Sequence, residues 1–332
     1  GMGSNFEESK AVFDSYFEKG GNFIDTANFY NFGESERFLG EYIADKRSQV
    51  VIATKYTGNI TAMKPNVKFN PNAGGNHRKS LVENLDESLK LMGTGYTDLL
   101  YVHAWEFRTP IEEVMRSLDD VAFYIAISNT PEWAISRANT IAEFRGWSRF
   151  IGLQTRYNLL NRSLEFGLQS ACAELEIGII PWGCIAEGFL TGKYTKESVA
   201  NSDKTGGRNY SIPKLAAEEK NWAILDEVKA IASEINKSPV QVALNWILQK
   251  PGITSPLIGA RTKAQLDENL KVLEFKLTPE QMARLDSISA PTDAPFPYNF
   301  LEQFDAYISK SIQSPDKFKP LRKVMGDLHK NL

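Results

Sequence analysis

The chain has 332 residues and a formal net charge of −3, with 38 basic and 41 acidic side chains interspersed along it. This balance lacks the electrostatic signature of a protein that binds nucleic acid or an anionic membrane. Cys172 and Cys184 are the only cysteines and have no paired spacing, which argues against a disulfide framework or a zinc site and favours a reducing, cytosolic setting.

Hydropathy and length narrow the class of protein further. No apolar run approaches the roughly 20 residues needed to cross a bilayer, and no signal peptide opens the chain. Because α/β barrels commonly run to about 250 residues and more, the chain is long enough for one large barrel or for two ordinary domains. We therefore expect a cytoplasmic protein with a substantial buried core.

Helix and strand patterns alternate along the chain. Apolar residues at helical spacing predict helices over 6–19, 35–45, 78–92, 110–122, 131–144, 163–176, 216–235, 239–249 and 263–273, and one more from Pro279. Short apolar runs predict strands that begin near Phe23, Val50, Asp98, Tyr124, Phe150, Ile177 and Thr254. Strands that alternate with helices form parallel sheets, so the pattern indicates an α/β fold.

Three stretches lack this periodicity. Residues 57–76 and 187–212 are rich in glycine and polar side chains, which predicts long loops. Beyond Ala290 the chain carries several aromatic residues up to Tyr307, and we expect this tail to fold over the sheet.

Polar side chains stand where three successive strands end. Asp25 ends the first apolar run, Lys55 ends the run VVIATK, and His103 follows the run LLYV. Tyr30 comes just after the first run. Because the carboxyl ends of parallel strands share one face, we expect these four side chains to converge, with Lys55 as the cationic partner that a buried Asp25 needs. Taken singly, each has an ordinary interpretation as a helix cap, a solvated lysine or a core histidine.

These motifs resemble those of the aldo-keto reductases. That family has a catalytic tetrad, which the stretches FIDTANFY, IATKY and LLYVHAW match with Asp25, Tyr30, Lys55 and His103. The resemblance runs from residue 6 to about 288 and implies a TIM (β/α)8-type parallel barrel. It implies a single domain over 1–332 with an aromatic-rich tail from about 290, and an oxidoreductase that reduces aldehydes or ketones with NADPH.

The resemblance extends to residues that hold the cofactor. Family positions around the nicotinamide and the diphosphate are matched by Ser128, Asn129, Gln154, Trp182, Gly183, Ile185, Gly188, Leu190 and Lys193. The first three would bond the carboxamide, and Trp182 would stack on the nicotinamide ring. Gly183 replaces a serine common in the family, and Glu187 replaces a glycine. An acid beside a diphosphate is unfavourable unless its side chain points away.

A second set of cofactor residues lies in PLIGARTKAQLDEN, over 256–269. Here a strand runs into a helix, whose free N–H groups and dipole favour an anion at its start. The planar guanidinium of Arg261 suits the 2′-phosphate of NADP and does little for the 2′-hydroxyl of NAD. The family's cofactor positions in this segment correspond to Ile258, Gly259, Arg261, Gln265 and Asn269. A solvated arginine in a turn is the ordinary alternative. The G-x-G-x-x-G fingerprint of a Rossmann domain does not occur.

Carbonyl reduction needs a proton on the oxygen as hydride reaches the carbon. A phenol is a weak acid, with a reference pKa of about 10, so Tyr30 needs its anion stabilised. Lys55, held by Asp25, would supply that stabilisation, and His103 would orient the carbonyl.

Aromatic residues in the loops at the same face indicate the substrate. Tyr56, Trp105, Phe107 and Tyr298 favour a pocket for apolar or aromatic aldehydes and ketones, although aromatic loop residues as often serve packing. The physiological carbonyl and the oligomeric state stay open.

Seven strand signals are readable, whereas a (β/α)8 barrel has eight. Members of the family open with a hairpin and a first strand, and this chain opens on what looks like the helix after that strand. The connection around 120–123 is also shorter than usual. Because an open seam exposes unpaired strand edges, we expect the native protein to carry residues that this sequence lacks.

Two other functions remain open. Potassium-channel β subunits share the fold and cofactor of the family and serve chiefly as partners. A pseudoenzyme is the other alternative, if the first strand is truly missing.

Overall fold

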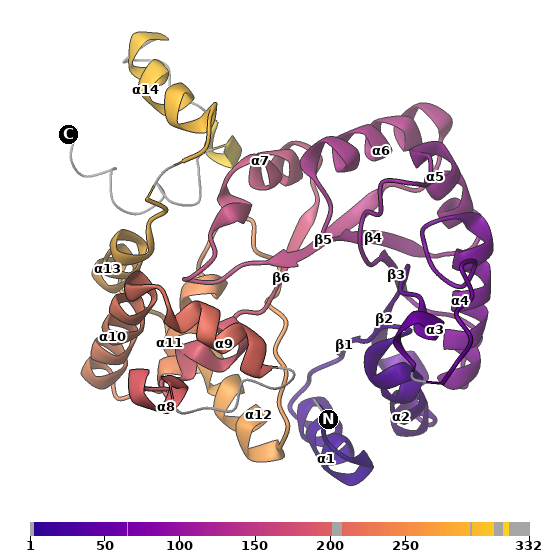
Figure 1. Ribbon diagram of the computed structural model, residues 1–332, viewed down its shortest axis with the longest axis horizontal. Coiled ribbons are helices and arrows are strands. Elements are labelled where there is room, and N and C mark those ends of the chain that lie inside the picture. The colour runs from indigo at the N-terminus through magenta and orange to yellow at the C-terminus, as the bar shows by residue number, and fades with distance from the viewer. Residues whose placement is uncertain (1–2, 65, 201–207, 293, 309–314, 319–332) are drawn as a thin grey trace. The chain divides into compact units, whose positions relative to one another are not determined.

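The computed structural model describes residues 3–64, 66–200, 208–292, 294–308 and 315–318 (Figure 1). The chain divides into two compact units, residues 1–154 with 259–267, and residues 155–258 with 268–332. The fold class is confirmed, because strands and helices alternate and the paired strands are parallel. The single domain expected from the sequence stays a prediction.

The first unit contains a parallel sheet whose strands follow chain order. Its strands are β1 (Phe23–Asp25), β2 (Val51–Tyr56), β3 (Leu99–Val102), β4 (Tyr124–Ser128) and most of β5 (Phe150–Arg156), whose last two residues belong to the second unit. Its helices before β5 are α1 (Phe6–Glu18), α2 (Glu34–Ile43), α3 (Ile60–Met63), α4 (Arg78–Leu91), α5 (Ile111–Asp119) and α6 (Glu132–Arg145). Helices α1, α2, α4, α5 and α6 pack on one another in this order, as repeated βα units require.

The core of the first unit lies where α1 and α2 meet β2. It buries Phe13, Leu39, Tyr42, Ile43, Val50, Ile52 and Met92. Gly40 allows a close approach here, because a Cβ at this position would come within 2.7 Å of the Met92 backbone. Burying these apolar side chains is what fixes the helices against the sheet.

The register of the strands determines which side chains share one face of the sheet. Asp25 lies opposite Ala53, and Lys55 lies opposite Tyr101. Since residues two apart on a strand face the same side, Asp25 and Lys55 share one face of the sheet, and His103 follows two residues after Tyr101.

The second unit contains β6 (Gly178–Trp182). Its helices are α7 (Gly167–Glu174), α8 (Lys196–Ala200), α9 (Arg208–Ala216), α10 (Glu219–Glu234), α11 (Pro239–Leu248), α13 (Pro279–Ser289) and α14 (Tyr298–Ile308), with 3₁₀ helices η3 (Ser163–Glu165) and η4 (Ala186–Thr191). Helix α12 (Lys263–Leu270) spans the boundary of the two sets of residues.

The strand predicted from Thr254 to Ile258 is wrong. This segment follows β6 in parallel, through a bridge between Ile179 and Ile253 and bonds from the N–H groups of Thr254 and Leu257 to β6 carbonyls, at 2.8 Å each. Pro256 has no N–H to donate, and Pro181 interrupts the donors of β6, so no regular ladder forms.

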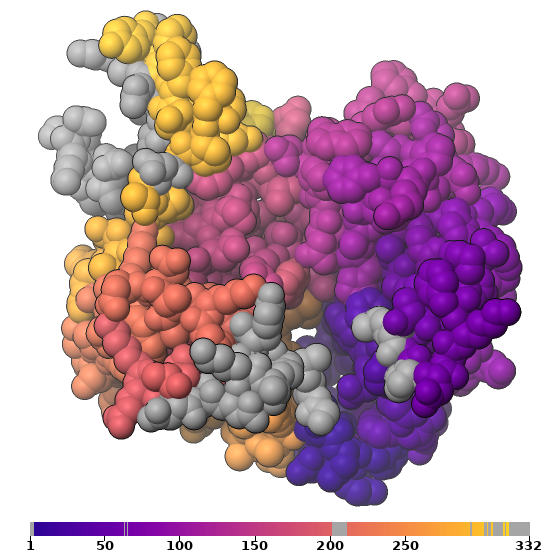
Figure 2. All heavy atoms as spheres, viewed as in Figure 1, coloured from indigo at the N-terminus to yellow at the C-terminus, as the bar shows by residue number. Residues whose placement is uncertain are grey.

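Two of the predicted loops contain helices. Residues 57–76 hold the short helix α3, which Asn59 caps by accepting from the Thr61 and Ala62 N–H groups. Residues 187–212 hold α8 and the start of α9, with 201–207 outside the described residues. The tail forms α14, shown in yellow in Figure 2, where Phe300 and Phe304 are exposed and stack on each other.

No strand precedes α1 in the described part of the chain, and within the first unit β1 pairs only with β2. The expected seam and missing first strand stay predictions. Each helix that the model describes is too short or too polar to cross a membrane. Both cysteines are free and buried.

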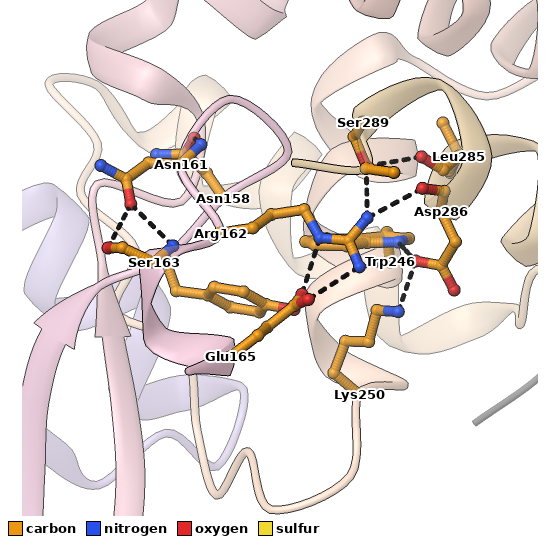
Figure 3. Close-up of polar contacts among 12 residues, drawn as sticks. Asn158, Asn161, Arg162, Ser163, Glu165, Trp246, Lys250, Leu285, Asp286 and Ser289 are labelled. Carbon is orange, nitrogen blue, oxygen red and sulfur yellow. Dashed lines mark hydrogen bonds and ion pairs between the residues drawn. The ribbon is translucent and has the colours of Figure 1, made fainter. Parts of the chain in front are cut away.

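A network of buried charges joins η3 to α11 and α13 in the second unit (Figure 3). The Arg162 guanidinium donates to both carboxylate oxygens of Glu165, at 2.7 and 2.9 Å, and to the Ser289 hydroxyl at 2.9 Å. Asp286 accepts from Lys250 and from the Trp246 indole. Two cations and two anions therefore balance in a region that excludes water.

Candidate active site

The four predicted catalytic side chains come together within the first unit. Asp25 ends β1, Lys55 lies on β2, and His103 directly follows β3. Tyr30 begins the 3₁₀ helix η1 (Tyr30–Gly33) just beyond β1. Convergence at the strand ends agrees with the sequence-based expectation, whereas the roles of these residues stay predictions.

Lys55 is the centre of the cluster. Its side chain is fully buried, and its ammonium forms an ion pair with Asp25. It also donates to the Thr26 carbonyl at 2.7 Å and to the Tyr30 hydroxyl at 3.4 Å. Burial lowers the pKa of Lys55, and the charge of Asp25 opposes this change. Asp25 and the Thr26 carbonyl thus hold the ammonium, and its remaining N–H donor contacts the phenol.

Tyr30 is held by an unusual turn. The two residues that follow it, Asn31 and Phe32, have φ angles of 47° and 59°, and Gly33 has φ 94°. Three successive left-handed residues turn the chain sharply, and a bulky residue such as Phe32 adopts this region at a cost of about 1–2 kcal/mol. The turn fixes where the phenol lies relative to β2.

The phenol keeps its proton more firmly than the sequence led us to expect. Burial, and then the negative charge of Asp25, raise the pKa of Tyr30. We had expected Lys55 to make this proton easier to release. Burial and Asp25 favour the neutral phenol in the resting site, and the stabilisation of a developing phenolate by Lys55 stays a prediction.

His103 is a buried, neutral imidazole. It stacks on the Phe29 ring, with 4.8 Å between centroids, and meets the edge of Tyr30 at 5.8 Å. Burial and the charge of Lys55 lower the pKa of His103 to about 3. Its Nδ1 atom is buried and makes no hydrogen bond with the described residues. The backbone N–H of His103 donates to the Thr57 hydroxyl at 3.2 Å.

Ser128, Asn129 and Gln154 lie beside the tetrad and support it. The Gln154 side-chain amide donates to the second Asp25 oxygen at 2.8 Å, and Asn129, at φ 48°, donates to the His103 carbonyl at 3.1 Å. Sequence reasoning assigned these amides to a cofactor and missed the bond from Gln154 to Asp25. The sequence shows that Gln154 is a polar residue at a strand end. It does not show that its partner Asp25 lies four strands away in the sheet.

The aromatic residues predicted for the pocket differ in role. Phe107 is 68% exposed, at φ 59°, and contacts Trp133, which is 50% exposed and meets the buried Trp105 edge-on. Tyr56 is instead a core residue, and its hydroxyl donates to the Asn76 carbonyl at 3.3 Å. Its burial favours the packing role that was the alternative for these aromatic residues. Tyr298 lies in the second unit against Phe166.

The segment with Gly259, Arg261 and Gln265 also belongs to the first unit. The Ser4 hydroxyl donates to the Arg261 carbonyl at 2.7 Å, and the Arg261 N–H donates to the Gln265 side chain at 2.9 Å. Arg261 is exposed, and its guanidinium makes no ion pair within the described residues. It therefore stands at the start of α12 with its donors available for an anion.

The remaining predicted cofactor residues lie in the second unit. They are Trp182 and Gly183 at the end of β6, Ile185, Gly188, Leu190 and Lys193 on and beside η4, Ile258, and Asn269 on α12. Two of these glycines, Gly183 and Gly188, have φ of 67° and 97°, which side chains rarely adopt.

Glu187 has a partner that the sequence did not reveal. The guanidinium of Arg156, the last residue of β5, lies 3.8 Å from the Glu187 carboxylate and 4.6 Å from the centre of the Trp182 ring. Glu187 itself has φ 58°. Because this cation offsets the acid, the turn around Gly188 is not left with an isolated negative charge.

Comparison with known proteins identifies the family. A model described as "Aldo/keto reductase family" matches residues 2–290. Norsolorinic acid reductase of Aspergillus flavus is 33% identical over 87% of this chain and 73% of its own length. Norsolorinic acid reductase B of Dothistroma septosporum is 33% identical over 97% and 82%, and a probable aryl-alcohol dehydrogenase of Saccharomyces cerevisiae is 34% identical over 93% and 96%. The chain belongs to the aldo/keto reductase family.

Proposed function

We propose that this protein is an NADPH-dependent reductase of aromatic aldehydes or ketones in a reducing cytoplasm. The single observation that carries the proposal is the buried Lys55, which contacts both Asp25 and the hydroxyl of Tyr30. A buried ammonium beside a phenol favours proton donation to a carbonyl oxygen, because the ammonium stabilises the phenolate that forms.

In this proposal NADPH supplies the hydride, and the side chains supply the proton and the electrostatics. Tyr30 donates its proton to the carbonyl oxygen as negative charge develops there. Lys55 stabilises the phenolate that results, because its charge is already placed and needs no reorganisation. Asp25 and Gln154 hold that charge in position. His103, which stays neutral, orients the carbonyl without adding a second cation to the site.

The residues toward the cofactor fit NADPH in two respects. Arg261, exposed at the start of α12 and without an ion pair among described residues, suits the 2′-phosphate. In the second unit, Trp182 offers an aromatic ring, and Arg156 with Lys193 outweighs the single charge of Glu187. Of these features, Arg261 supports NADPH over NADH, because the two cofactors differ only in the 2′-phosphate.

The proposed substrate class rests on exposed aromatic side chains and on the relatives. Phe107, in the loop after β3, and Trp133, in the first turn of α6, form an apolar surface on which a planar ring can stack. The names of the relatives refer to norsolorinic acid and to aryl alcohols. We extend the aryl character to this chain.

The test is reduction of a panel of aryl and aliphatic aldehydes, followed by the loss of NADPH absorbance, with Tyr30→Phe as the matched variant. The variant should bind NADPH almost normally and lose a factor of about 10² to 10⁴ in kcat, since only the proton donor is removed. A variant that keeps more than about a tenth of the activity would remove Tyr30 from the acid role. Cofactor binding without any turnover by the unmodified protein would favour a partner subunit or a pseudoenzyme.

A further inference from the structure

The end of β6 is held by the segment that follows β5. Both belong to the second unit. The Tyr157 N–H donates to the Trp182 carbonyl at 3.3 Å, and the Asn158 side-chain amide donates to the Gly183 carbonyl at 2.8 Å. Two successive carbonyls of the turn are thus bound by two successive residues.

Both the oxygen and the nitrogen of the Asn158 side-chain amide form hydrogen bonds, which fix its position. Asn158 is 3% exposed, and its side-chain oxygen accepts from the N–H groups of Leu160 and Asn161, at 2.9 Å each. The backbones of Asn158 and Asn161 also exchange two hydrogen bonds, at 3.0 and 3.1 Å. With its oxygen occupied, the amide has one orientation in which its N–H group meets Gly183.

The loop that carries Asn158 is itself anchored by the buried charges. Figure 3 shows Asn158 and Asn161 immediately before Arg162, whose guanidinium reaches Glu165 and Ser289. The Tyr157 hydroxyl donates to Glu165 at 2.7 Å, and its ring stacks on Trp246 at 5.2 Å. A neutral, fully satisfied network of this kind leaves the loop little freedom.

The Gly183 carbonyl connects the loop that carries Asn158 to the turn after β6. It accepts from Asn158 and also from the Ala186 N–H, at 2.9 Å, at the start of η4. Gly183 has φ 67°, so the chain reverses at this residue. A change in the direction of this carbonyl therefore moves both the Trp182 ring before it and the η4 turn after it.

We propose that Asn158 is a positioning residue that sets the Trp182–Gly183 turn for the nicotinamide end of the cofactor. This inference rests on the proposed function, in which the Trp182 ring stacks on the nicotinamide. Asn158 does not touch the reacting atoms, and it acts through the Gly183 carbonyl. Both Asn158 and Asn161 are asparagines in one loop, and the structure separates them, because Asn158 donates to the Gly183 carbonyl whereas Asn161 accepts from Ser163.

The test compares Asn158→Asp with Asn161→Asp. Both substitutions add the same charge to the same loop. Aspartate at 158 keeps the acceptor for the loop N–H groups but places a carboxylate oxygen against the Gly183 carbonyl. Asn161 accepts from the Ser163 N–H and hydroxyl, at 3.3 and 2.8 Å, and aspartate retains both bonds.

The readout is the dissociation constant for NADPH and for 2′,5′-ADP, which lacks the nicotinamide. Asn158→Asp should weaken NADPH by roughly 5- to 30-fold, the lower part of the range for a buried acceptor that loses a donor, because the Ala186 N–H still donates to the Gly183 carbonyl, and it should leave 2′,5′-ADP within about two-fold. Asn161→Asp should leave both within about two-fold. Hydrogen exchange at the Ala186 amide, measured without cofactor, should speed up in Asn158→Asp alone.

Each outcome decides a different question. Equal effects of the two substitutions on NADPH, or equal weakening of NADPH and 2′,5′-ADP by Asn158→Asp, would overturn the positioning role. If Asn158→Asp fails to fold, Asn158→Ser with the same ligands serves instead, and an unchanged ratio of the two affinities would refute the role. Failure of the unmodified protein to bind either ligand would refute the proposed function.

Discussion

Lowering the pH from 7 to 5 should destabilise the protein through His103. Burial and the neighbouring charge of Lys55 lower the pKa of this imidazole from 6.5 to about 3. In the unfolded chain the same group takes up a proton near pH 6.5. Between these two values the unfolded state binds one proton more than the folded state, so the free energy of unfolding falls as the pH falls.

The magnitude follows from the two pKa values. One pKa unit corresponds to about 1.4 kcal/mol, and the imbalance acts over about 1.5 pH units between pH 6.5 and pH 5. His103 alone should therefore cost about 2 kcal/mol of unfolding free energy at pH 5. Carboxylates elsewhere titrate as well, so the reference is His103→Gln, which is polar, similar in size and unable to take up a proton.

Urea unfolding of both proteins at pH 7, 6 and 5 provides the measurement. The loss between pH 7 and pH 5 should be about 2 kcal/mol greater with His103 than with Gln in its place. An NMR titration of labelled histidine checks the cause directly, since the His103 ring should stay neutral down to about pH 4. Equal losses in the two proteins, or a His103 ring that titrates near 6.5, would refute the reasoning.

Three further predictions concern charged side chains. Arg261→Ala should weaken NADPH relative to NADH by roughly ten- to a hundred and fifty-fold in Kd. The control is Lys263→Ala, which should leave the ratio almost unchanged because the Lys263 ammonium is paired with Asp267. Equal loss of both cofactors in Arg261→Ala would place the phosphate site elsewhere. Arg162→Ala should lower the free energy of unfolding by about 3–5 kcal/mol. Arg284→Ala, which removes an exposed arginine, should lower it by less than about 1 kcal/mol. Similar values for the two variants in urea unfolding would contradict a water-free network. Glu187→Gln should tighten NADPH by roughly two- to five-fold at low salt, and weaker binding would show that the acid is needed to hold Arg156.

Much of the fold could be predicted because it rests on local patterns. Helical spacing of apolar residues located α1, α4 and α11 to within about two residues of their ends. At the start of α11 the structure contains both bonds of a capping box formed by Ser238 and Gln241. Signals of this kind lie within a few residues of one another, so tertiary contacts are not needed to read them.

The errors arose where backbone donors and distant partners decide the structure. An apolar run over 254–258 has the composition of a strand, yet Pro256 leaves it without the N–H that a ladder needs. The helices within 187–212 lie in a polar stretch, where Val199 is the buried side chain of α8 and packing supplies what periodicity did not indicate.

Some contacts of the candidate site could likewise be predicted from the sequence, and others could not. Asp25, Lys55 and His103 could be brought together from the sequence because parallel strands end on one face and residues alternate along each strand. The bond from Gln154 to Asp25 and the ion pair of Arg156 with Glu187 could not, because each joins segments whose spacing depends on the completed sheet and turn. The same holds for Asn158 and Gly183.

The groups around Tyr30 act differently before and after its proton leaves. Burial and the Asp25 carboxylate both favour the neutral phenol, so its pKa is raised. A proton that leaves Tyr30 changes this balance, because the new phenolate would lie 3.4 Å from the ammonium in a site with little water to screen it. Burial and Asp25 therefore keep the acid neutral at rest, and Lys55 is placed to stabilise the anion once it forms. This requires the ammonium to stay fixed, which the Thr26 carbonyl and the Asp25 carboxylate ensure.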